Sequence, residues 1–128
     1  MELLSSQFEV LELTAFGKEA SSLLVLHDFN GLANRFGYAL AQGQDPAIAI
    51  EADYRRALES PHKISQGEAP SIAVKFFQQN NTGLVAVVES IVPVTRDSAV
   101  LLELIVTRSG ERAHITLEDI SGYLPQSC

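Results

Sequence analysis

The sequence is poor in the residues that build disulfide frameworks and most metal or nucleophilic sites. Cys128 is its only cysteine, so an intrachain disulfide is impossible. It has no tryptophan, and its three histidines follow no zinc-ligand spacing. Glycine-rich phosphate-binding patterns and the nucleophile elbow of hydrolases are also missing. We therefore expect no metal and no cofactor, and enzymes are the least supported class of function.

Basic residues and long apolar runs are scarce as well. Nine lysines and arginines stand against sixteen aspartates and glutamates, which gives a net charge of −7. Because the basic residues do not cluster, we expect no nucleic-acid partner. No apolar run approaches the length of a membrane span, and residues 1–13 lack the basic region of a signal peptide. These features predict a cytoplasmic chain without membrane contact.

The apolar residues are plentiful enough for one core. They make up 46% of the 128 residues, and a chain of this length buries about two-thirds of its unfolded surface. The sequence has no internal repeat, low-complexity tract or linker. We therefore expect a single domain that comprises residues 1–128.

The strongest structural signal lies between residues 83 and 108. Two β-branched apolar runs flank a short polar turn, which is typical of an antiparallel β-hairpin. Side chains alternate along a strand, so the even-numbered residues form one face and the odd-numbered residues the other. The even face, expected in the core, comprises Leu84, Ala86, Val88, Val92, Val100, Leu102, Leu104 and Val106. The odd face comprises Val85, Val87, Ile91, Leu101 and Ile105, interrupted by Glu89 and Glu103.

Two helices and one strand are expected before the hairpin, in addition to a first strand over residues 8–16 that Gly17 ends. An apolar stripe predicts a helix from about Ser22 to Gly43, although residues 22–27 also fit a strand. Asp45 as N-cap and Pro46 at the first position predict a second helix that ends near Ser60. Residues 72–77 alternate as a strand.

A short strand over residues 113–115 and a short closing helix over residues 116–124 are expected after the hairpin. Thr116 with the acidic residues that follow it resembles a helix N-terminus. The fold class is therefore α+β: an antiparallel meander of three to five strands, two main helices packed on one face, and a short C-terminal helix.

Strand parity brings charged residues together on the odd face. Paired residues must have numbers that sum to an even value if both even faces share one core. This rule places Glu103 opposite or diagonal to Glu89, with carboxylates roughly 5–8 Å apart, and it places Lys75 opposite Val87. The group fits a partly wet face in which Lys75 offsets one glutamate, or a self-association surface. It also fits an acid–base pair or a site for a cationic ligand.

We expect a non-enzymatic protein-binding module that forms a homodimer through the odd face. The interface candidates on that face are Val87, Ile91, Leu101 and Ile105. Small size and acidic charge also suit a module that neutralises a basic partner, as immunity proteins and antitoxins do. The alternative is a small-molecule pocket between sheet and helices, lined by Lys75, Glu89, Glu103 and Tyr54. An enzyme that uses Glu89 and Glu103 is the least supported reading.

Overall fold

The computed structural model describes residues 1–3, 9–59, 71–78, 82–95 and 98–122, which form an α+β domain with an antiparallel sheet. Its elements in chain order are β1 (Glu2–Leu3), α1 (Val10–Val25), α2 (Phe29–Phe36), the 3₁₀ helix η2 (Ala39–Ala41), α3 (Pro46–Leu58), β2 (Ser71–Phe76), β3 (Leu84–Thr95), β4 (Ser98–Ser109) and β5 (Arg112–Gly122).

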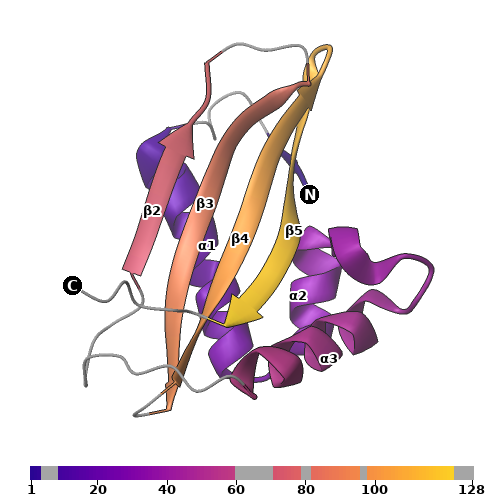
Figure 1. Cartoon of the computed structure of the whole chain (residues 1–128). Coiled ribbons are helices and arrows are strands. Elements are labelled where there is room, and N and C mark those ends of the chain that lie inside the picture. Colours follow the sequence, from indigo (N-terminus) through magenta and orange to yellow (C-terminus); the bar gives the residue numbers. More distant parts are fainter. Residues whose placement is uncertain (4–8, 60–70, 79–81, 96–97, 123–128) are drawn as a thin grey trace.

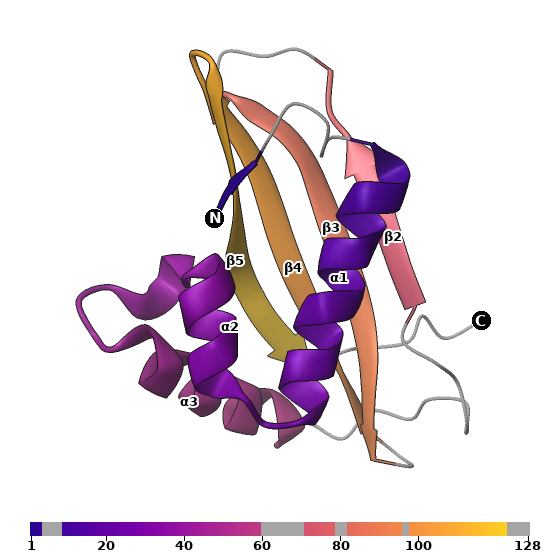
Figure 2. The same cartoon turned by 180° about the vertical axis from the view of Figure 1, so that it is seen from behind.

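The five strands form one sheet in the order β1-β5-β4-β3-β2. β2 to β5 are a meander, and β1 adds a short strand beside β5. In Figure 1, α1 runs behind the sheet, and α2 and α3 lie beside β5. The reverse view shows α1 across β2 and β3, with α2 and α3 beside β5 (Figure 2). We call the side without helices the outer face.

The central hairpin has the predicted pairing. Glu89 lies opposite Glu103, and Lys75 of β2 lies opposite Val87. Leu102 is fully buried, as predicted for the even face, and the neighbouring Leu101 is only half-buried.

The hairpin prediction is wrong at the start of β3. A register shift between Leu84 and Ala86 pairs Leu84 with Thr107. Leu84, expected in the core, is half-buried, and Val85, expected on the outer face, packs against the core. The irregularity therefore exchanges these two residues between the faces.

Residues 10–25 form a helix, so the predicted strand over 8–16 and its end at Gly17 are wrong, while Phe8 lies outside the described residues. The buried side chains follow a helical period: Leu13, Phe16, Ala20 and Leu24. Gly17 is a contact point and not a terminator, because a Cβ there would lie 2.9 Å from Ile72 Cγ2 and 3.0 Å from Ser90 Oγ. The glycine thus lets α1 approach the sheet closely.

The predicted helix from Ser22 to Gly43 is confirmed only in part: residues 22–25 and 29–36 are helical, but the chain reverses at His27 and the second helix stops before Gly43. The amide of His27 donates to the Leu24 carbonyl and the amide of Asp28 to the Leu23 carbonyl, which is a Schellman ending of α1. Asp28 then caps α2 by accepting from the Gly31 amide at 2.9 Å. α2 ends at Gly37, whose φ is +71°. Residues 22–25 are therefore helix.

The Schellman ending places a histidine where glycine is usual. His27 has φ +57°, in the left-handed region. A residue with a Cβ costs about 1–2 kcal/mol there, because the Cβ crowds the following carbonyl oxygen. The backbone at His27 is therefore strained.

The predicted second helix is confirmed. α3 begins at Pro46, and the Asp45 carboxylate accepts from the Ile48 amide at 3.3 Å. Glu51 and Arg55 form an ion pair one turn apart, at 2.6 Å. Asp45 and Pro46 thus fix the start of this helix as the sequence indicates.

Residues 112–122 are one continuous strand, so the short strand and closing helix are wrong up to residue 122. Leu124 and the predicted helix end lie outside the described residues. β4 pairs Glu103 with Asp119 but Leu104 with Leu117, which leaves Glu118 as the extra residue of a bulge. The bulge explains why Leu117 and Ile120 are both buried although they are three residues apart.

Replacement of Gly17 tests the close approach of α1 to the sheet. Gly17→Ala should lower the free energy of unfolding by about 1–2 kcal/mol, because overpacking outweighs the better helix propensity of alanine. Ser22→Ala, at an exposed position of the same helix, should not destabilise. Urea unfolding measures both variants. A stabilised Gly17→Ala variant would contradict the packing described here.

Ser90 supplies a second test at the same contact. Its hydroxyl is buried and has no hydrogen-bond partner among the described groups. Ser90→Ala should therefore raise the free energy of unfolding by about 1 kcal/mol, since it removes an unsatisfied polar group. An unchanged or lower midpoint in thermal unfolding would show that the hydroxyl has a partner in solution.

Candidate functional site

Three carboxylates form a row across the outer face. The β3–β4 register sets Glu89 opposite Glu103, and the β4–β5 register sets Glu103 opposite Asp119. All three residues are half-buried. Directly opposed like charges on neighbouring strands repel one another. The row is therefore an arrangement that folding alone does not favour.

One lysine neutralises part of the negative charge of this row. Lys75 Nζ lies 2.7 Å from Glu89 Oε1. The hydrogen bond from Lys75 to Glu89 and the attraction to that carboxylate raise the pKa of the lysine. The lysine side chain is largely exposed, so the pair contributes little to stability. The pair leaves Glu103 and Asp119 as the remaining charges of the row.

The charged form of Glu103, in the middle of the row, is disfavoured. Burial raises its pKa above the ordinary value of 4.5, and the charges of Asp119, Glu89 and Glu118 raise it further, while Lys75 opposes them. A cation placed here would relieve this repulsion. The middle of the outer face thus carries negative potential that the described residues neutralise only in part.

Apolar side chains surround the carboxylates. Val87 and Ile91 stand on β3, and they lie opposite Ile105 and Leu101 of β4. Val87 is 9% exposed and the other three are half-buried. No described helix covers these side chains (Figure 1). The structure therefore brings together seven of the eight residues that the sequence singles out.

Tyr54, the eighth, is elsewhere. It stands on α3, on the helical side of the sheet, where its hydroxyl lies 3.3 Å from His27 Nε2. Burial raises the pKa of Tyr54. A single pocket lined by Tyr54 and the outer-face carboxylates, as considered from the sequence, is thus wrong because the sheet separates them.

Asp119 was not among the predicted site residues, because the sequence pattern placed it in a helix. Its only available signal was the acidic pair Glu118–Asp119 among alternating apolar residues. His27–Asp28, the adjacent pair in the sequence, does not form a dyad, since Asp28 caps α2. Within the described residues no group of three histidine, cysteine or acidic side chains is arranged to hold a metal ion.

Comparison with known proteins gives no further guide. The chain matches none of the protein families, curated proteins and solved structures with which it was compared. Among the described helices, none is both long and apolar enough to cross a membrane. Function therefore has to be argued from the geometry of the surface.

The raised pKa of Glu103 predicts that this residue lowers the stability of the fold in a pH-dependent way. Because the native state holds the proton more tightly than the unfolded chain, stability falls as the pH rises through 4.5 and then through the raised pKa. Glu103→Gln should therefore raise the free energy of unfolding at neutral pH, by about 0.5 kcal/mol after solvent screening. The gain should vanish below about pH 4, where both forms are neutral.

Thermal unfolding across this pH range measures the effect. Glu111→Gln, at an exposed position between β4 and β5, is the matched control and should show no gain. A Glu103→Gln gain that persists in acid would mean that packing, and not charge, causes it.

Proposed function

We propose that this chain is a non-enzymatic protein-binding module that binds a basic protein partner through the outer face of its sheet. The observation that carries the proposal is the row of Glu89, Glu103 and Asp119 within an apolar surround. None of the described helices lies over this face of the sheet (Figure 1).

Charge complementarity argues for a basic partner. Lys75 pairs with Glu89, so the row keeps an excess of negative charge around Glu103. A lysine or arginine from a partner would turn mutual repulsion into attraction, and the net charge of −7 would speed the encounter. The cost of keeping these carboxylates together is then offset in the complex.

The apolar residues indicate what else the partner presents. Val87, Ile91, Leu101 and Ile105 would form the centre of an interface whose polar part is the carboxylate row. A helix with one apolar face and basic residues beside it fits this combination. The partner class is therefore a basic amphipathic segment.

A second copy of the chain, expected from the sequence, is the competing occupant. Each copy brings the same excess of carboxylates, so self-association works against a repulsion that a basic partner removes. A homodimer held by the apolar residues would resist salt, whereas a complex with a basic partner should weaken as salt increases.

Binding of an amphipathic leucine–lysine peptide tests the proposal. The triple variant Glu89→Gln/Glu103→Gln/Asp119→Asn should bind this peptide at least about tenfold more weakly, because charge-assisted contacts are lost. The control Glu9→Gln/Glu12→Gln/Glu59→Gln removes the same number of charges at exposed positions in α1 or next to the ends of α1 and α3. It should change the affinity by less than about threefold, since screened charges act weakly.

Two results would overturn the proposal. Equal losses in both triple variants would show a response to net charge alone. A salt-resistant dimer in sedimentation, dissociated by Ile105→Asp, would show instead that a second copy is the occupant.

A further inference from the structure

The edge of the sheet that β2 forms is open among the described strands. β2 pairs with β3 on one side, and no described strand lies on its other side. The amide of Phe77 donates to the Val85 carbonyl of β3 at 2.9 Å. Because peptide groups alternate in direction along an antiparallel strand, those of Ile72, Val74 and Phe76 point toward the open edge. These residues therefore offer their N–H and C=O groups to another strand.

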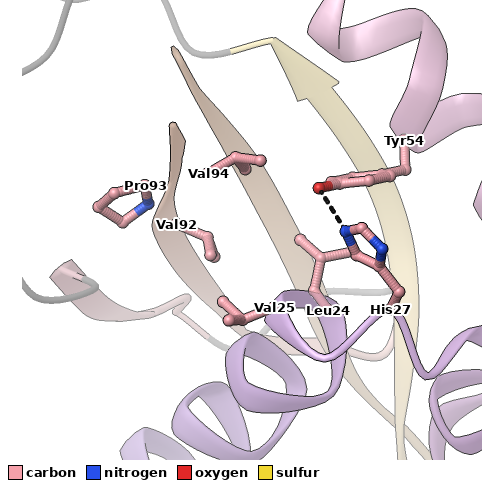
Figure 3. Close-up of a pocket in the computed structure, with 7 residues that line it drawn as sticks. All are labelled: Leu24, Val25, His27, Tyr54, Val92, Pro93 and Val94. Carbon is pink, nitrogen blue, oxygen red and sulfur yellow. Dashed lines mark hydrogen bonds between the residues drawn. The ribbon is translucent and has the colours of Figure 1, made fainter. Parts of the chain in front are cut away.

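The rest of the sheet's edge is blunted, whereas β2 is not. The opposite edge is β1, which has only two residues. Within the described ladder, β2 pairs no further than Ile91, so the edge passes to β3 there. Pro93 stands on this stretch and has no N–H to donate. Figure 3 shows its ring turned away from the side on which Tyr54 lies. Proteins commonly protect exposed edges by short strands and prolines, and β2 lacks both devices.

Lys75 does not close the edge of β2 either. A lysine on an edge strand can prevent pairing with another chain. The Lys75 ammonium, however, lies 2.7 Å from the Glu89 carboxylate of β3, so this side chain reaches toward the neighbouring strand and away from the edge. β2 contains no acidic residue. The edge therefore carries no unpaired charge that would repel an approaching strand.

Exposed apolar side chains gather at one end of this edge. Phe76, Phe77, Val10 and Leu11 are between 43% and 82% exposed. They are four of the eight large apolar residues that are exposed in the described part of the chain. Figure 2 shows the first turn of α1, where Val10 and Leu11 stand, beside the end of β2. Contiguous exposed apolar surface marks interaction sites, and here it adjoins open backbone groups.

We propose that β2 pairs with β2 of a second copy about a two-fold axis, which joins two five-stranded sheets into one. With Val74 on the axis, Ile72 of each copy faces Phe76 of the other. This register pairs all three outward-facing residues with one another, and any other register leaves one of them without a partner in β2. It sets Lys75 opposite Ala73, so that no lysine directly faces a lysine.

The symmetry of the edge favours a second copy over a strand of another protein. The same register satisfies the N–H and C=O groups of both copies and covers Phe76 on each. A two-fold contact uses one edge of each copy, so association stops at the dimer. The outer faces remain uncovered and lie on the same side of the joined sheet. The inference thus goes beyond the proposed binding of a basic partner and does not compete with it.

Sedimentation of the whole chain at high micromolar concentration tests the inference. The chain should sediment at twice its mass of 13.9 kDa. Phe76→Lys should weaken the dimer at least about tenfold, because it sets a charge against Ile72 of the second copy. Ile48→Lys places the same charge at an exposed apolar position of α3 and should have no effect. Ile105→Asp, on the outer face, should also leave the dimer intact. A monomer, or a dimer that Phe76→Lys does not weaken, would overturn the inference.

Amide hydrogen exchange of the unsubstituted chain gives a second readout that needs no variant. Dilution from dimer to monomer should speed exchange at Ile72, Val74 and Phe76 by at least about tenfold, since their amides then face solvent. The amides of Ala73 and Lys75 point toward β3 and should keep their rates. Equal changes in both groups, or no change in either, would contradict pairing through this edge.

A disulfide across the axis tests the register. Paired Cα atoms that exchange both hydrogen bonds lie ~5.5 Å apart, within the ~4.4–6.8 Å that a disulfide spans. Val74→Cys/Cys128→Ser, which removes the only native cysteine, should therefore form a linked dimer on mild oxidation. Ile48→Cys/Cys128→Ser is the matched control and should link at least about tenfold more slowly, because it relies on random collision. Equal rates of linkage in the two variants would show that Val74 does not lie on the axis.

Discussion

The pairing of β3 with β4 is the constraint on which the rest of the molecule depends. Once Glu89 faces Glu103, strand alternation sends Val88, Leu102 and Leu104 into the core. A shift by one residue would put Glu89 and Glu103 on opposite faces, so that one of them would be buried beneath the helices at a prohibitive cost. The same register therefore builds the core and sets the carboxylate row on the outer face.

The position of α1 depends on a close contact with the sheet. Gly17 sits over Ile72 and Ser90, and a side chain there would collide with both. A strand residue and a helix residue far apart in sequence thus fix each other. Neither has a local signal that reveals the contact.

Local chemistry made some elements predictable from the sequence. Asp45 and Pro46 mark the start of α3 because a cap and a fixed φ act within one turn. The hairpin and the positions of Glu89, Glu103 and Lys75 followed from alternation alone. Where long-range packing or a β-bulge determines the structure, rules based on local sequence gave wrong predictions. Residues 10–16 fit both a strand and a helix, and Gly17 resembled a terminator.

The bulge at Glu118 had the largest consequence for the site. It inserts one residue between Leu117 and Ile120, which gives the spacing of three that is typical of a helix. Asp119 was therefore not expected in the row. The His27–Tyr54 pair was equally hidden, because it depends on a chain reversal at a histidine where glycine is the usual residue.

The outer face also has a rival surface, since α1 exposes Val10, Leu11, Val25 and Leu26 to solvent. Methyl NMR of the chain with the leucine–lysine peptide decides between the two surfaces most directly. If the outer face is the binding surface, the methyl resonances of Val87, Ile91, Leu101 and Ile105 shift and those of α1 do not. Shifts confined to Leu11, Val25 and Leu26 would contradict the assignment of function to the carboxylate row.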